Sequence, residues 1–132
     1  LQFYSMSDNK LFQLTDEDKE KYKSSIKKID ISTQNHIIKV AVPKINKIIA
    51  GNVTNVEAQL IDDVVHIIGL LENYPELTEH MKQRMIFALS YFCDENDEIP
   101  DIIPGIGYLD DALVAQWIVD GIMQELPPLT EA

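Results

Sequence analysis

Residues 97–117 read DEIPDIIPGIGYLDDALVAQW, and this stretch holds a dense cluster of residues that restrict or bend the backbone. Two prolines and two glycines fall between Pro100 and Gly107, with aliphatic side chains among them. Each proline fixes its own φ and restricts the residue before it. A solvated loop seldom carries so many aliphatic residues, so we expect a rigid, packed connection whose isoleucines are mostly buried.

On either side of this connection the apolar residues recur at helical spacing. Thr54 and Glu57 form a capping-box pattern that opens a helix, and Val56, Leu60 and Val64 continue along one face of it. Apolar residues surround most of the last helix, which predicts a central, buried position. We expect an all-α single domain, a bundle of about five helices near residues 16–29, 34–50, 54–73, 78–93 and 110–125. The Pro/Gly-rich loop joins the last two.

The segment 34–50 is ambiguous, because HIIKVAV at residues 36–42 also has the β-branched content of a strand. Ile38, Val42, Ile45 and Ile49 nevertheless follow helical spacing, and Gly51 suits a helix end. We therefore predict a helix that kinks or restarts at Pro43.

Length and charge limit the classes of function. At 132 residues the chain is most simply one domain, residues 6–132, and residues 1–5 resemble the remnant of an expression tag. Nine lysines and six acidic residues give residues 1–50 a net charge of +3, whereas residues 51–132 carry −14. The acidic excess argues against nucleic-acid binding. A single cysteine, Cys93, excludes an internal disulfide and agrees with a cytoplasmic location.

The segment 88–114, ALSYFCDENDEIPDIIPGIGYLDDALV, resembles the signature of the YkvA-like family of bacterial domains of unknown function. The family has a proline where Glu95 stands and apolar residues at Asn96 and Glu98, so this connection is more polar than in relatives. The resemblance implies a helical fold and no known activity. The matching positions are Ala88, Leu89, Tyr91, Asp97, Ile99, Pro100, Asp101, Ile103, Pro104, Gly107, Tyr108, Leu109, Asp110, Asp111 and Ala112.

Two similar segments suggest a metal site. Ile61-Asp62-Asp63-Val64 and Leu109-Asp110-Asp111-Ala112 each place two carboxylates on an expected helix. If those helices face each other, Asp63, Asp110 and Asp111 could bind Mg²⁺ or Mn²⁺. The competing interpretation, which we favour, is a solvated helix face without a cofactor, because Asp62 and His66 fall opposite the apolar stripe.

The two acids of the second segment have different expected roles. Asp111 falls at the centre of the apolar face, so we expect it to be buried, bonded to the free N–H groups of the helix start or to Arg84. Asp110 falls towards the polar edge, where it would cap the helix or face solvent. We expect the structural signature to comprise Arg84, Asp97, Pro100, Asp101, Pro104, Gly107, Tyr108 and Asp111.

Ile102, Ile103 and Ile106 could form an exposed docking patch, although capping the open end of the bundle is the favoured alternative. Phe87 points away from the Met85 face and is either a dimer contact or part of a second packed layer.

The leading hypothesis is a non-enzymatic interaction or regulatory module with an unknown protein partner or a second copy. The alternatives are a metal-dependent hydrolase and a peripheral membrane protein, although the negative charge disfavours anionic bilayers.

Overall fold

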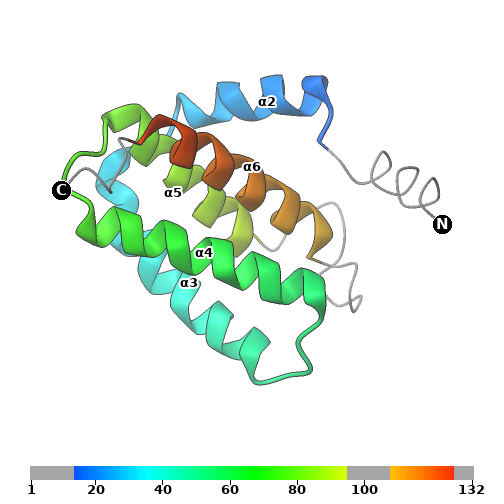
Figure 1. Ribbon diagram of the computed structural model, residues 1–132. Coiled ribbons are helices and arrows are strands. Elements are labelled where there is room, and N and C mark those ends of the chain that lie inside the picture. Colours follow the sequence, from blue (N-terminus) through cyan, green and yellow to red (C-terminus); the bar gives the residue numbers. More distant parts are fainter. Residues whose placement is uncertain (1–13, 95–107, 127–132) are drawn as a thin grey trace.

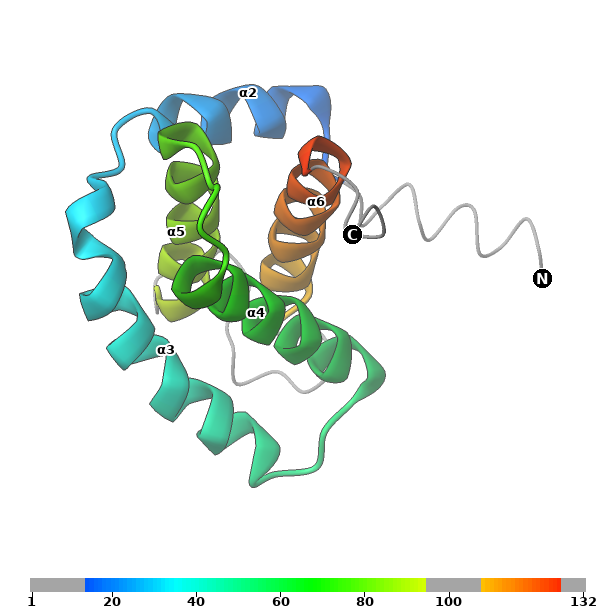
Figure 2. The same cartoon turned by 60° about the vertical axis from the view of Figure 1, so that its left-hand side comes forward.

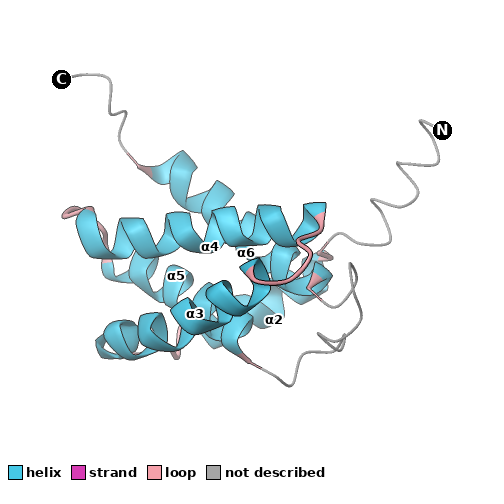
Figure 3. Ribbon diagram, turned by 90° about the horizontal axis from the view of Figure 1, so that it is seen from below, coloured by secondary structure: helices cyan, strands magenta, loops and turns pink. Residues whose placement is uncertain are grey.

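A computed structural model describes residues 14–94 and 108–126, and within these ranges the chain is helical without strands (Figures 1 and 3). The predicted all-α single domain is therefore confirmed. The elements are α2 (Asp16–Ile26), the short 3-10 helix η1 (Ile31–Thr33), α3 (Gln34–Ile49), α4 (Asn55–Asn73), α5 (Glu79–Cys93) and α6 (Leu109–Glu125).

Threonines define three of the helix starts. The side chain of Thr54 accepts the backbone N–H of Glu57 at 3.1 Å, and the Glu57 carboxylate accepts the N–H of Thr54 at 3.0 Å, which completes the predicted capping box. Thr15 forms the same reciprocal pair with Asp18 at the start of α2. Thr78 accepts the N–H of Met81 at the start of α5. Local sequence therefore fixes where these helices begin.

Helix α3 continues through Pro43. The predicted helix is therefore present, but it does not restart at the proline. Proline lacks the N–H that would bond one turn back and crowds that turn. Pro43 lies on the exposed side of α3, where water can satisfy the carbonyl that loses its partner. Ile38, Ala41 and Ile45 face the core on the other side and hold the helix in place.

The centre of the bundle is formed by α4, α5 and α6, and α5 also packs against α2, α3 and η1 (Figures 1 and 2). The α4 and α6 helices run in the same direction, whereas α5 runs opposite to both (Figure 1). Leu60, Met85, Leu89 and Ile122 have no measurable exposure and form the middle of the core. None of the described helices combines the length and apolar character needed to cross a membrane.

Helix α2 lies across one end of α5. Its Ile26 is 1% exposed, and the Gln83 side chain of α5 donates to the backbone oxygen of Ile29 at 3.1 Å. No Cα atom of α2 comes within 8 Å of α6. The separation is bridged by two rings, Tyr22 and Trp117, whose centroids are 6.2 Å apart. Two pockets that are both lined by Trp117 lie between α2 and α6, one also lined by Lys19 and Asp120 and the other by Ile26 and Gly121.

Candidate functional site

The family-like signature is only partly visible in the structure, because the described chain stops at Asp94 and resumes at Tyr108. The expectations for its central positions lie outside the described residues, and the docking patch and the rigid loop therefore stay predictions. These positions are Asp97, Pro100, Asp101, Ile102, Ile103, Pro104, Ile106 and Gly107.

Asp110 takes part in a polar chain that connects three helices. The Tyr91 hydroxyl donates to Asp110 Oδ2 at 3.0 Å and lies 3.4 Å from the Tyr22 hydroxyl. Burial, the bond with Tyr22 and the nearby Asp110 charge all raise the pKa of Tyr91 above its usual range. Asp110 is half-buried, so it does not face solvent fully as one of its two expected roles required, and the capping role stays a prediction. Its partner lies on another helix and cannot be inferred from the pattern within α6.

Asp111 is 2% exposed in the first turn of α6, so the expected burial is observed. Near the start of α6, α3 contributes Lys44, whose Nζ donates to the backbone oxygen of Phe92 at 2.5 Å and lies 5.7 Å from the ring centroid of Tyr108. Burial raises the pKa of the Cys93 thiol to about 11, with Lys44 opposing the rise and Asp111 adding to it. A thiol that stays protonated at neutral pH is a poor nucleophile.

Arg84 does not provide the cation that was expected for Asp111. Its guanidinium holds Glu125 with two bonds, Nη2 to Oε1 at 2.6 Å and Nη1 to Oε2 at 2.9 Å. These bonds hold the pKa of Glu125 below its usual value. Because α5 and α6 run in opposite directions, a residue early in α5 lies beside the end of α6 and far from its first turn (Figure 1).

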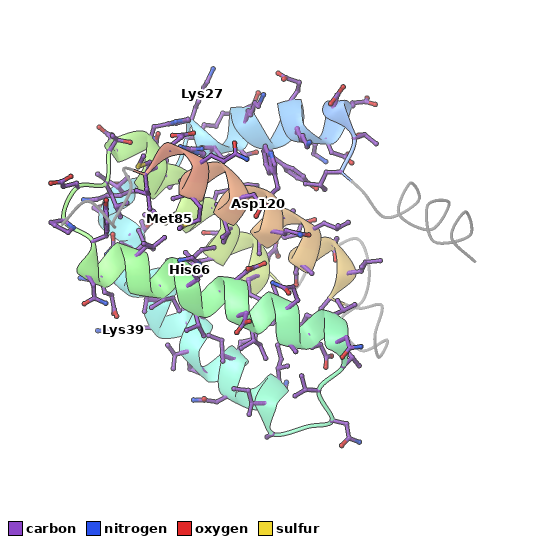
Figure 4. All side chains as sticks on the ribbon, viewed as in Figure 1. Lys27, Lys39, His66, Met85 and Asp120 are labelled. Atoms are coloured by element: carbon purple, nitrogen blue, oxygen red, sulfur yellow. The ribbon has the colours of Figure 1, made fainter. Side chains whose placement is uncertain are left out.

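Asp63 is the second buried carboxylate, 8% exposed in the middle of α4. The Gln59 side chain donates to Oδ1 at 3.3 Å, whereas Oδ2 is buried and meets no donor among the described residues. Burial raises the pKa of Asp63, the bond from Gln59 opposes the rise, and the charges of Asp120 and Asp62 add to it. Figure 4 shows His66 on α4 and Asp120 on the adjacent α6.

The structure does not bring the carboxylates of the predicted metal site together. Asp63 is the ninth residue of α4, and the charge on α6 that acts on it is Asp120. Nine residues of helix, about 14 Å, separate Asp120 from Asp111 along α6. Within residues 14–94 and 108–126, no group of three His, Cys, Asp or Glu side chains could hold a metal ion. The two acidic pairs thus lie in different surroundings.

Phe87 is 8% exposed and packs beneath α2, with its ring centroid 5.6 Å from that of Tyr22 and 6.1 Å from that of Tyr91. It therefore belongs to a packed layer in this chain. Sequence reasoning did not single out Tyr22 or Lys44. The spacing of Lys44 in the sequence could have indicated that it lies beside the core. It follows the buried Ala41 by three residues and precedes the buried Ile48 by four, which places it at the edge of the apolar stripe of α3.

Comparison with known proteins adds one finding. The model of a family described as a protein of unknown function, DUF1232, matches residues 82–117, from the second turn of α5 to the middle of α6. No curated protein and no solved structure matches the chain. The match covers the same region as the YkvA-like resemblance and agrees with it. The segment formed by α5, the connection after it and the first half of α6 is thus similar to DUF1232, a family without an assigned activity.

Proposed function

We propose that this domain is a non-enzymatic interaction module that binds a lysine- or arginine-rich segment of a partner protein. The binding surface would be the acidic face of α4 and α6, which we define by Asp62, Asp63, His66 and Asp120. The observation that carries the proposal is Asp63, because its carboxylate is buried and one of its oxygens has no donor within the described residues.

The charge of these two helices supports a basic partner. Between their ends α4 and α6 contain no lysine or arginine, and each contributes four carboxylates. The two helices pack side by side, so these charges share one part of the molecule (Figure 1). Complementary charge speeds encounter and selects partners. The carboxylates are Glu57, Asp62, Asp63, Glu72, Asp110, Asp111, Asp120 and Glu125.

Asp63 gives this face a specific point of attachment. A buried acceptor without a donor costs about 1–3 kcal/mol, and more when it is charged. An ammonium or guanidinium group from a partner would supply the missing donor and lower the repulsion between Asp63, Asp62 and Asp120. Since Asp62 and Asp120 are exposed, such a group can approach from solvent.

The arrangement of the signature favours binding over catalysis. Its described polar groups hold helices together: Tyr91 bonds to Asp110, and the backbone oxygen of Phe92 accepts a bond from Lys44 of α3. Cys93 stays a thiol at neutral pH. The hydrolase alternative needs converging carboxylates, whereas Asp63 and Asp111 are apart. Titration with Mg²⁺ or Mn²⁺ by calorimetry tests that alternative directly.

An octalysine peptide tests the proposal by calorimetry at low and at physiological salt. We expect the double variant Asp62→Asn/Asp120→Asn to bind the peptide about tenfold more weakly than the wild type, a loss of about 1.4 kcal/mol. The matched control is Glu76→Gln/Glu79→Gln, which removes the same charge from exposed positions outside the face. We expect this control to change the affinity by less than twofold at physiological salt, where long-range attraction is screened.

Equal losses in the two double variants would show that the peptide responds to net charge alone, and the proposed face would be wrong. Asp63→Asn gives an independent check, because it removes the buried charge while leaving its exposed neighbours. This variant should also bind the peptide more weakly. Unchanged affinity in Asp63→Asn would remove Asp63 from the binding site.

A further inference from the structure

A pocket of about 310 Å³ lies between α2, α5 and α6, on one side of the Tyr22–Trp117 ring contact. Its apolar surface comes from Ile26 of α2 and from Trp117, Ile118 and Gly121 of α6. A volume near 300 Å³ is at the small end of the range for ligand sites in proteins. The pocket therefore suits a small ligand with an apolar body.

The polar side chains that line this pocket are all basic. They are Lys23 of α2, Lys27 directly after α2, and His80 and Arg84 of α5, and no acidic residue is among the described lining residues. This is unexpected in a chain with a net charge of −11. Arg84 is one of only two lysines or arginines after residue 50, and it lies in this wall. The surroundings select an anion by charge.

Two acidic neighbours contact the cations of this pocket, and Lys23 and Lys27 nevertheless stay exposed. Glu20 contacts Lys23 at 3.3 Å, but both side chains are more than half exposed, and such pairs contribute about 0–1 kcal/mol. Glu125 occupies two nitrogens of Arg84. The third, Nε, is buried and has no acceptor among the described residues. Lys27, which directly follows α2 (Figure 4), is exposed and is one of the residues that line the pocket.

We propose that this pocket between α2, α5 and α6 binds a small amphipathic anion, with its apolar body against Trp117 and Ile118 and its carboxylate or phosphate at Lys23 and Lys27. Burying the body removes apolar surface from water at about 25 cal/mol per Å². The charged head stays at the rim, where Lys23 and Lys27 are exposed to solvent. This site goes beyond the proposed function, since its charge preference is opposite to that of the acidic face and it uses other residues.

Gly121 controls how much room the pocket offers. A Cβ atom built at Gly121 would lie 3.4 Å from Arg84 Nη1, so a methyl group would touch the guanidinium that forms the wall. A larger side chain at this position would occupy the pocket itself. Glycine within a helix costs about 0.5–1 kcal/mol relative to alanine, so filling this position need not unfold the helix. Gly121→Leu is therefore a suitable blocking variant.

Trp117 provides a direct signal for binding, because it is the chain's single tryptophan and it lines the pocket. The probes are octanoate and octyl phosphate, titrated into the full chain while Trp117 fluorescence is recorded, with calorimetry as a second measurement. We expect both anions to shift the emission to shorter wavelength in a saturable way, because the apolar chain displaces water from the indole. The tighter of the two identifies the preferred head group. Octanol and octylamine, which lack the negative charge, should bind at least tenfold more weakly.

Variants separate the two parts of the site. Lys23→Gln/Lys27→Gln should weaken octanoate binding about tenfold, whereas Lys39→Gln/Lys47→Gln, exposed positions on α3, which does not line the pocket, should leave it unchanged. Gly121→Leu should abolish binding. Its control is Gly69→Leu on α4, where a Cβ would meet no atom within 4 Å. Far-ultraviolet circular dichroism verifies that each variant is folded.

Three results would overturn the proposal. The first is that neither anion binds, and the second is that octanol binds as tightly as octanoate. The third is that the α2 lysine variant binds as tightly as the α3 lysine variant, which would show that the pocket does not use its basic rim.

Discussion

The α4 and α6 helices look alike in sequence and differ in how they use the same residues. Each carries two adjacent aspartates between aliphatic neighbours, and each lacks lysine and arginine. In α4 the pair occupies the eighth and ninth positions, where Asp62 is exposed and Asp63 is buried with one oxygen lacking a donor within the described residues. In α6 the pair occupies the second and third positions, where Asp110 bonds to Tyr91 and Asp111 is 2% exposed.

The difference arises from the position of each pair along its helix. The first turn of a helix has backbone N–H groups without intrahelical partners and a favourable dipole for anions. The middle of a helix offers neither, because its N–H groups already bond to the preceding turn. A buried carboxylate therefore fits the start of α6 better than the centre of α4. We infer that Asp111 stabilises the fold and that Asp63 lowers its stability.

The largest expected effect is at Asp111. Asp111→Ala should lower the free energy of unfolding by about 3 kcal/mol, because removing one member of a buried charge interaction leaves the other member uncompensated. Asp110→Ala removes the acceptor of the Tyr91 hydroxyl and should cost about 1 kcal/mol. Urea denaturation at pH 7 measures both. Small and equal losses would mean that Asp111 does not hold α6 in place.

Local patterns predicted much of this structure. The apolar spacing predicted the five helices and the Thr54–Glu57 capping box predicted the start of α4, because both signals act within one turn of the chain. Burial of Asp111 followed from its place on the α6 wheel. The loop between α5 and α6 lies outside the described residues, so its expected rigidity and the burial of its isoleucines stay predictions.

Contacts between helices were harder to predict from the sequence than the helices themselves. The pairing of Arg84 with Glu125 depends on the opposite directions of α5 and α6, which no periodic pattern within either helix records. The same holds for Tyr22, which reaches Tyr91 across 69 positions of sequence. The pocket beside Trp117 arises because α2 is anchored on α5 and stays apart from α6, so its composition could not be inferred from any one segment.

The ionised Asp63 carboxylate should lower the free energy of unfolding. Because its folded pKa is raised above the unfolded value of about 3.9, ionising Asp63 costs stability. This loss of stability is absent below the pKa of Asp63 in the unfolded state. It develops as the pH rises through the pKa of Asp63 in the folded state, and it is complete above that pKa. Asp63→Asn should therefore be more stable than the wild type at pH 7, by about 1 kcal/mol, since a neutral amide is easier to bury than an unpaired charge.

Urea denaturation between pH 4 and pH 7 tests this relation. The advantage of Asp63→Asn should grow with pH and then level off, whereas Asp62→Asn, at the exposed neighbour, should show a smaller change. An advantage that does not depend on pH, or a variant less stable than the wild type at pH 7, would show that Asp63 is not an unpaired buried charge. The acidic face would then lose its proposed attachment point.

The smallest expected effect compares the single glycines of the two helices. Gly69 of α4 has open space where a Cβ would lie, so Gly69→Ala should stabilise the protein by about 0.5–1 kcal/mol through the lower entropy of the unfolded chain. At Gly121 of α6 the added methyl would lie 3.4 Å from Arg84 Nη1, which is held by Glu125 at 2.9 Å. The guanidinium must shift slightly, so Gly121→Ala should gain less than Gly69→Ala. Thermal denaturation of the two variants resolves the difference. Equal gains would mean that Arg84 moves freely and that the basic wall of the pocket is less rigid than its two bonds to Glu125 imply.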